Sequence, residues 1–153
     1  YNKENTQNMI DEILRKKDPD SFHGFLILDM DHFKEVNDVY GHAMGDKVLE
    51  MLGNFLKKQF REQDVIGRIG GDEFVILLYN IGSRQNMENR VKSLQEKIRE
   101  IHMDGMEGHT FTLSAGIAFA PQDGDTFMEL YQKADLALYQ VKRSGRNGYR
   151  IYK

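Results

Sequence analysis

The sequence predicts a single-domain α/β or α+β fold with a central mixed sheet, mainly antiparallel and five-stranded, flanked by helices. Three observations support this prediction. The chain has 153 residues, 40% hydrophobic and 29% charged, which suffices for one hydrophobic core. Helix-like and strand-like patterns follow one another in the order α-β-α-α-β-β-α-β-α-β. One glycine pair joins two adjacent strands, while helices connect the others, so the sheet resembles palm and ferredoxin-like arrangements.

Hydrophobic periodicity places the individual elements. Residues spaced three or four apart predict helices over about 3–17, 32–40, 45–60, 87–101 and 126–143. Apolar runs predict strands over 22–28, on both sides of Gly70-Gly71 (65–66 and 75–79), over 110–120 and over 149–152. No repeat or linker interrupts this order, so we treat residues 1–153 as one domain. Because the chain starts abruptly at Tyr1, we expect an upstream region to be missing.

Composition narrows the classes of function. The chain has no cysteine, which excludes disulfides and thiolate metal sites and fits a reducing cytoplasm. No apolar run approaches the roughly 18 residues of a membrane span. A net charge of -3 gives no general electrostatic reason to bind nucleic acid. We therefore expect a cytoplasmic domain without nucleic-acid binding or direct membrane contact, although the full-length protein could be tethered to a membrane.

The glycine pair lies in the stretch Arg68 to Phe74, which reads Arg-Ile-Gly-Gly-Asp-Glu-Phe. Glycine reaches the positive φ of tight two-residue turns, so Gly70-Gly71 predicts a hairpin. Asp72 and Glu73 follow directly. Two adjacent carboxylates at the edge of an apolar sheet are costly unless a cation or a proton offsets their repulsion. Taken alone, the stretch is more typical of a polar loop tip than of a functional site.

Asp29 and Asp31 come directly after the apolar strand 22–28, where an open sheet usually binds its ligand. Either aspartate could instead cap the helix that begins near His32, although capping explains Asp31 more readily than Asp29. Asp29 is expected to be half buried and to need a cation. If the hairpin strand lies beside this strand, Asp72 or Glu73 meets Asp29, and such oxygen ligands suit Mg²⁺.

Cationic and polar residues complete the candidate set. Lys34 lies in the first turn of a helix, where anions bind, but it could be an ordinary solvated lysine. Lys142, Arg143 and Arg146 surround a helix C-terminus, where cations are also favoured by the helix dipole.

An amide and a carboxylate could recognise a base. Asn37 and Asp46 offer the acceptors and donors that suit the N1–H and amino group of guanine. They could alternatively be a turn residue and a helix cap.

Together these segments resemble the GGDEF family of diguanylate cyclases, bacterial enzymes that condense two GTP molecules into cyclic di-GMP. The resemblance covers nearly the whole chain. It rests on these motifs, in order: Asp29-Met30-Asp31-His32-Phe33-Lys34, Asn37-Asp38, Gly41-His42, Gly45-Asp46, Gly70-Gly71-Asp72-Glu73-Phe74, Ala134-Asp135-Leu136-Ala137-Leu138-Tyr139 and Lys142 to Asn147.

The resemblance implies roles for the matched positions. Asp29, the Met30 carbonyl and Asp72 would bind Mg²⁺, with Mn²⁺ possible, and Glu73 would assist the metals or proton removal. The backbone near Phe33, with Lys34, Lys142 and Arg146, would hold the triphosphate. Asn37 and Asp46 would recognise guanine, with His42 near the nucleotide. The general base stays open between Asp72 and Glu73.

The resemblance also implies partners. Each domain would hold one GTP, so the active unit would be a homodimer, brought together by an upstream sensory or dimerisation domain. Arg61 and Asp64 match an Arg-x-x-Asp motif at the family's distance before the hairpin and would bind cyclic di-GMP as a feedback inhibitor. The alternative for this pair is an ordinary helix end with two solvated charges. Arg68 and Arg90 are candidates for the additional arginines that such a site needs.

Overall fold

The computed structural model describes residues 2–16 and 18–153, so Tyr1 and the predicted helix end at Lys17 lie outside the described residues. The helices within this part of the chain are α1 (Lys3–Arg15), α2 (Phe33–Tyr40), α3 (His42–Gln59), α4 (Arg84–Arg99) and α5 (Phe127–Arg143). The strands are β1 (His23–Met30), β2 (Val65–Gly70), β3 (Glu73–Leu78), β4 (Leu113–Ala120) and β5 (Tyr149–Ile151). The predicted order of elements is confirmed.

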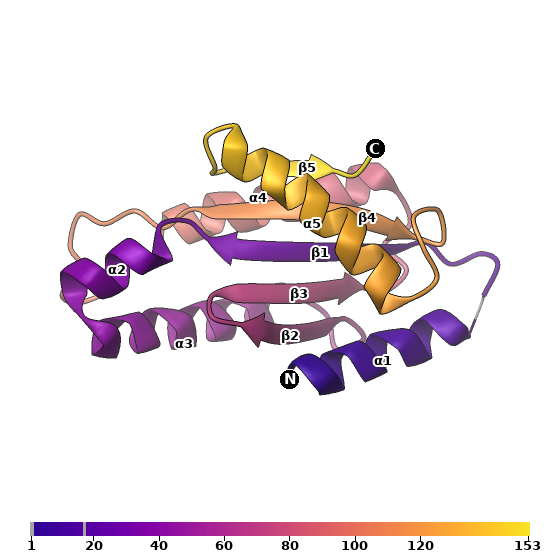
Figure 1. The fold of residues 1–153 in the computed structure, drawn as a ribbon, viewed down its shortest axis with the longest axis horizontal. Coiled ribbons are helices and arrows are strands. Elements are labelled where there is room, and N and C mark those ends of the chain that lie inside the picture. The colour runs from indigo at the N-terminus through magenta and orange to yellow at the C-terminus, as the bar shows by residue number, and fades with distance from the viewer. Residues whose placement is uncertain (1, 17) are drawn as a thin grey trace.

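The strands form one five-stranded sheet in the order β2-β3-β1-β4-β5 (Figure 1). β1 is the central strand and runs antiparallel to both β3 and β4, β2 is antiparallel to β3, and only the β4–β5 pair is parallel. The predicted mixed, mainly antiparallel sheet is therefore confirmed. All eight residues of β1 are buried, because strands cover both of its edges and helices cover both of its faces.

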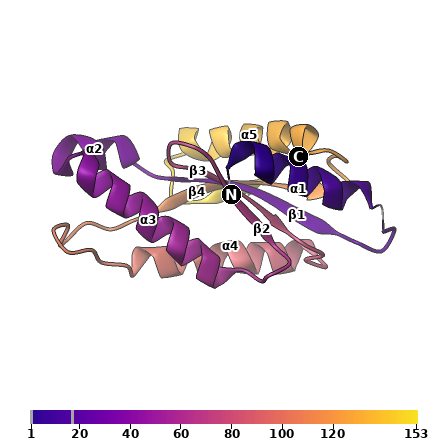
Figure 2. The same cartoon turned by 90° about the horizontal axis from the view of Figure 1, so that it is seen from below.

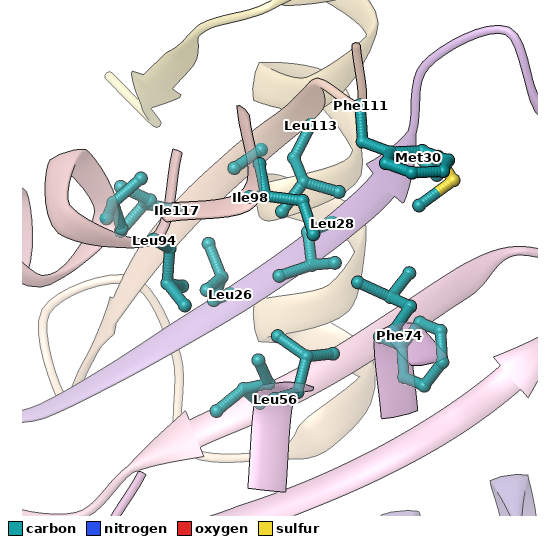
Figure 3. Packing of buried hydrophobic residues seen from close by; sticks show 14 of the residues in the cluster. Leu26, Leu28, Met30, Leu56, Phe74, Leu94, Ile98, Phe111, Leu113 and Ile117 are labelled. Carbon is teal, nitrogen blue, oxygen red and sulfur yellow. The ribbon is translucent and has the colours of Figure 1, made fainter. Parts of the chain in front are cut away.

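Helices cover the two faces of the sheet in pairs, with α1 and α5 on one face and α3 and α4 on the other (Figure 2). Because successive side chains of a strand point to opposite faces, Leu26 and Leu28 pack in the core beneath α3 and α4 (Figure 3). Phe25 and Ile27 pack beneath α1 and α5. α5 packs closely against β4 at Gly116. Only glycine fits there, because a Cβ atom would lie 2.1 Å from the Ala134 carbonyl oxygen of α5.

Several predicted boundaries differ from the structure. β1 continues through Asp29 and Met30, because Asp29 is paired with Glu73 of β3 on one side and Ser114 of β4 on the other. α3 begins at His42 instead of Gly45, and β4 begins at Leu113 instead of residue 110.

The hairpin turn is also shifted by one residue. Gly70 pairs with Glu73, so the turn consists of Gly71, with φ 47°, and Asp72 instead of the predicted Gly70-Gly71. In the part of the chain that the structure describes, no helix is long and apolar enough to cross a membrane.

Candidate functional site

Three segments that are distant in sequence meet at one end of the sheet: the end of β1, the β2–β3 turn, and the C-terminal end of α5 with the loop that follows (Figure 1). Together with the start of α2, they line a cleft of about 260 Å³. The predicted site residues that line it are Asp29, Met30, Phe33, Lys34, Asp72, Lys142 and Arg146. The structure therefore brings both acidic motifs together with Lys34, Lys142 and Arg146, whereas Arg143 lies over the Tyr139 ring, outside the lining of the cleft.

Asp29 is the buried charge of this cleft, with only 9% of its side chain exposed. Its Oδ2 atom accepts a hydrogen bond from the Lys142 ammonium group of α5, whereas Oδ1 is buried and has no hydrogen-bond partner. Burial raises the pKa of Asp29 to about 6, Lys142 opposes this rise, and the nearby charges of Asp72 and Glu73 add to it. The residue thus has one oxygen available for a further cation.

Glu73 lies opposite Asp29 in the strand pairing, as predicted for one member of the acidic pair. Its Oε1 atom accepts a hydrogen bond from the Tyr131 hydroxyl of α5, and the Tyr131 ring stacks on Phe127 with centroids 5.7 Å apart. Burial first, and then Glu73, raises the pKa of Tyr131. This contact draws Glu73 toward α5.

Sequence reasoning missed Tyr131. Its position 11 residues before Lys142 is the signal that could have found it, because 11 residues are close to three helical turns and place both on one face of α5.

Asp72 lies in the turn itself, half buried, and lines the cleft. The turn is anchored by Arg68, whose Nε donates to the Gly71 carbonyl oxygen at 2.8 Å. Because Asp72 belongs to the turn and Glu73 to the strand, the two carboxylates are free to take different directions.

The residues around Asp29 fit a divalent cation in part. A buried carboxylate oxygen without a partner is costly and is the kind of ligand that Mg²⁺ prefers. Asp72 lines the same cleft, and the Met30 side chain is packed in the core (Figure 3), so Met30 could contribute only its backbone carbonyl. Within residues 2–16 and 18–153, however, no three His, Asp or Glu side chains converge closely enough to hold a metal ion. Asp29 and Asp72 thus fit a metal better than Glu73 does.

The N-terminus of α2 is at the mouth of the cleft. α2 begins at Phe33, and Lys34 is exposed in its first turn. The capping role considered for Asp31 is wrong: the capping position is His32, without a side-chain hydrogen bond. Asp31 is buried and instead accepts hydrogen bonds from the hydroxyls of Thr112 and Ser114, both at 2.6 Å, and from the Asn147 backbone N–H at 2.9 Å.

Asn37 lies in the last turn of α2 and packs against α3. A Cβ atom at Gly45 would lie 1.8 Å from Asn37 Oδ1 and 3.5 Å from the Phe33 ring, so the glycine makes room for both side chains. The cap considered for Asp46 is wrong, because Asp46 lies inside α3 and is exposed there. His42 is exposed at the start of α3. These three predicted nucleotide contacts lie on α2 and α3, outside the lining of the cleft, and Phe33 connects the two regions.

Arg61 and Asp64 form a separate cluster at the other end of the β2–β3 hairpin. The Asp64 side chain is fully buried and accepts from the Tyr79 N–H at 2.9 Å and from the Arg61 guanidinium at 3.3 Å. Arg61 also donates to the Tyr79 carbonyl oxygen, and its side chain is 42% exposed. The alternative of two solvated charges is therefore wrong for Asp64.

A groove of about 520 Å³ runs past this pair and is also lined by Arg68 and Phe74. The other candidate arginine, Arg90, packs over the Phe60 ring and donates to the Gln59 carbonyl oxygen at 2.7 Å.

Comparisons with known proteins agree with these features. Residues 1–148 match the family described as "Diguanylate cyclase, GGDEF domain". The chain is 37% identical over 130 residues to the probable diguanylate cyclase DgcT of Escherichia coli, which covers 80% of this chain and 27% of that protein. It is also 37% identical over 130 residues to the cyclic di-GMP phosphodiesterase NbdA of Pseudomonas aeruginosa, covering 83% of this chain and 16% of that protein.

Among solved structures, the chain resembles the crystallised GGDEF domain of TpbB (YfiN) from Pseudomonas aeruginosa, with a TM-score of 0.93 and 31% identity. That likeness covers 100% of this chain and 96% of the crystallised one. By contrast, the chain spans about a quarter or less of the two curated relatives named above.

The ion pair between Asp29 and Lys142 gives a pH-dependent prediction for Lys142→Met. The pKa of Asp29 in the folded protein lies above its ordinary value of 3.8, so the folded state binds the proton more tightly. The stability that this proton contributes is present below about pH 4 and is lost as the pH rises through about 6. At about pH 7.5 the variant leaves this charge without its cation. We expect a loss of about 1–2 kcal/mol in the free energy of unfolding, less than for a fully buried pair because Lys142 is a third exposed. At about pH 5 the carboxyl is protonated and the loss should shrink.

Urea unfolding without divalent cations measures both values, with Lys92→Met on the exposed side of α4 as the control. Equal losses at the two pH values would show that Lys142 acts through packing and not through the charge of Asp29.

Proposed function

The chain belongs to the diguanylate cyclase GGDEF-domain family, and from that premise we propose that it condenses two GTP molecules into cyclic di-GMP and two pyrophosphates. One observation supports this best. A buried carboxylate with an unsatisfied oxygen, Asp29, shares a cleft with Asp72 and with three cations suited to a triphosphate, Lys34, Lys142 and Arg146.

The cations and the start of α2 bind the triphosphate in this proposal. Lys34 and the free backbone N–H groups near Phe33 offer a helix N-terminus to the phosphates. Lys142 and Arg146 approach from the end of α5, and Arg146 can bind two phosphate oxygens at once. Lys142 would then divide its charge between Asp29 and the nucleotide.

Asp29, Asp72 and the Met30 carbonyl would hold Mg²⁺, or Mn²⁺ in its place. A bound divalent cation would offset the charge that develops on the α-phosphate and favour ionisation of the attacking hydroxyl. Glu73 is the second candidate for metal binding, and it would have to share its carboxylate with Tyr131.

The reaction joins the 3′-oxygen of each GTP to the α-phosphorus of the other. The bond from each α-phosphorus to the bridging oxygen breaks, pyrophosphate leaves, and Asp72 or Glu73 accepts the proton of the 3′-hydroxyl. Each chain offers one cleft, so two copies must face each other as a homodimer. An upstream sensory or dimerisation domain in the longer protein would bring them together, in the cytoplasm, where GTP is available.

Guanine recognition is assigned to the α2–α3 pair. Asn37 is held against Gly45, and Asp46 is the next residue along α3, so an amide and a carboxylate can meet the N1–H and amino group of the base. His42 lies nearby at the start of the same helix.

A turnover assay tests the proposal. The protein fused to a dimeric coiled coil, with GTP and Mg²⁺, should yield cyclic di-GMP and pyrophosphate in a ratio of about one to two. Asp72→Ala should lower the turnover rate at least about a hundredfold, because a ligand of the reacting centre is lost, while the unfolding free energy changes by less than about 1 kcal/mol.

The matched control is Asp20→Ala, an exposed carboxylate in the turn before β1. It should leave the rate unchanged. A folded, dimeric protein that consumes no GTP, or an Asp72 variant with the rate of the parent protein, would refute the proposed activity.

A second candidate is a non-catalytic domain that binds GTP or cyclic di-GMP, because one relative, NbdA, is named for the opposite activity. The intact pair Asp72 and Glu73 argues against it. In the same assay, GTP binding without product would favour this candidate.

Arg61 and Asp64 are proposed as the product-inhibition site. The exposed part of the Arg61 guanidinium faces the groove beside Arg68 and can stack on or pair with guanine, while the buried Asp64 holds Arg61 in place.

Arg61→Ala should therefore raise the concentration of cyclic di-GMP that halves the initial rate by about tenfold or more, because it removes charge-assisted contacts to the base. The uninhibited rate should stay the same, since Arg61 lies outside the catalytic cleft. Gln63→Ala, at an exposed position outside the lining of the groove, is the control. Inhibition that is identical in the Arg61 variant would exclude this groove as the product site.

A further inference from the structure

Asp31 makes hydrogen bonds that serve neither to bind a metal nor to cap α2. Its carboxylate is buried and accepts three hydrogen bonds: from the Thr112 and Ser114 hydroxyls and from the Asn147 backbone N–H. Its own N–H donates to the Thr112 carbonyl oxygen at 2.9 Å. Both carboxylate oxygens are thus occupied, so Asp31 is not available as a ligand in the cleft.

The third of these contacts fixes the loop between α5 and β5. Gly145, Arg146 and Asn147 have φ values of 111°, 67° and 48°. Glycine and asparagine tolerate this left-handed region, but arginine rarely adopts it, and such a conformation persists only where its surroundings enforce it.

Several hydrogen bonds hold this loop, among them one from Arg99 of α4 to the Asn147 side chain at 3.2 Å and one from the Ala115 N–H to the Gly148 carbonyl oxygen at 3.0 Å. Two others lie directly at Arg146. The Arg146 N–H donates to the Val141 carbonyl oxygen at the end of α5, at 3.0 Å, and the next N–H, of Asn147, donates to Asp31 at 2.9 Å. Arg146 is therefore held between the helix end and a carboxylate anchored on β4. Its side chain lines the cleft with Lys34 and Lys142.

We propose that Asp31 is a positioning residue that fixes the strained loop conformation at Arg146 and thereby raises the affinity of the cleft for the triphosphate of GTP. This inference rests on the proposed function for its ligand. Asp31 itself touches neither nucleotide nor metal, so its effect on binding passes through Arg146.

A double-mutant cycle tests this. The probe is a GTP analogue with a methylene group between the α- and β-phosphates, titrated by calorimetry in the presence of Mg²⁺. Arg146→Ala should weaken binding about tenfold through loss of a charge-assisted contact, and Asp31→Ala by nearly as much. The double variant should bind within about twofold of Arg146→Ala alone, because both changes remove the same contact.

Asp31→Asn is the conservative variant. Its amide oxygen can keep the bonds from the Asn147 N–H and the Thr112 hydroxyl, and the Ser114 hydroxyl can turn to accept from the amide nitrogen. It should bind more tightly than Asp31→Ala, and the same cycle can be run with it if the alanine variant does not fold. Asp123→Ala is the matched control: this carboxylate anchors the turn at the opposite end of β4, accepting from the Phe119 N–H at 2.8 Å, and its loss should leave the affinity within about twofold.

A nucleotide-free measurement separates this inference from the proposed function. Amide hydrogen exchange over residues 144–148 should become faster in the Asp31 variants and stay unchanged in Asp123→Ala. If exchange is faster in the Asp31 variants but the parent protein binds no GTP analogue, Asp31 anchors the loop, and its proposed role in triphosphate binding is refuted. Unchanged exchange, or losses of affinity that multiply in the double variant, would overturn the role of Asp31.

Discussion

A single buried carboxylate, Asp29 at the end of the central strand, determines how the cleft is built. Burying an ionised carboxylate costs several kcal/mol unless cations and hydrogen bonds compensate. The fold offsets this cost only in part: Lys142 of α5 donates a hydrogen bond to Oδ2 of Asp29, whereas Oδ1 has no hydrogen-bond partner. The fold therefore leaves unsatisfied charge at the point where β1, the hairpin turn and the end of α5 meet.

The elements of the fold could be predicted from the sequence because they follow from local patterns. The apolar run before Asp29 and the helical spacing in α4 and α5 are visible without any tertiary information. The pairing of β1 with the hairpin strand could be stated only as a condition, and the structure meets it by placing Glu73 opposite Asp29. The turn was misplaced by one residue because either glycine could supply the positive φ, and strand register chose Gly71.

The contacts that orient the site residues could not be predicted. Asp31 meets Asn147 across 116 positions of sequence and Thr112 across 81, and Glu73 meets Tyr131 across 58. Nothing in the local pattern distinguishes an aspartate that caps a helix from one that anchors a distant loop. The same limit applies to Asp64, whose buried oxygens bind the backbone on both sides of the hairpin.

The β2–β3 hairpin connects the two proposed sites. Its turn carries Asp72 into the cleft, while its open end is closed by Asp64, just before β2, and by Tyr79, just after β3. A ligand bound beside Arg61 would therefore contact the open end of the β2–β3 hairpin, whose turn bears Asp72, a proposed metal ligand. This arrangement gives the feedback proposal a physical route through one two-stranded unit.

The proposed site depends on a free oxygen of Asp29 for a divalent cation, and Mn²⁺ binding as a function of pH is the most direct test of that oxygen. Electron paramagnetic resonance can report free Mn²⁺ in the absence of nucleotide. Because the pKa of Asp29 is about 6, the affinity should fall as the pH decreases below that value, by about tenfold for each pH unit. Asp29→Asn should bind Mn²⁺ weakly at every pH. An affinity that is independent of pH between about 5 and 7, or equal in the Asp29→Asn variant, would exclude Asp29 as a ligand of the cation.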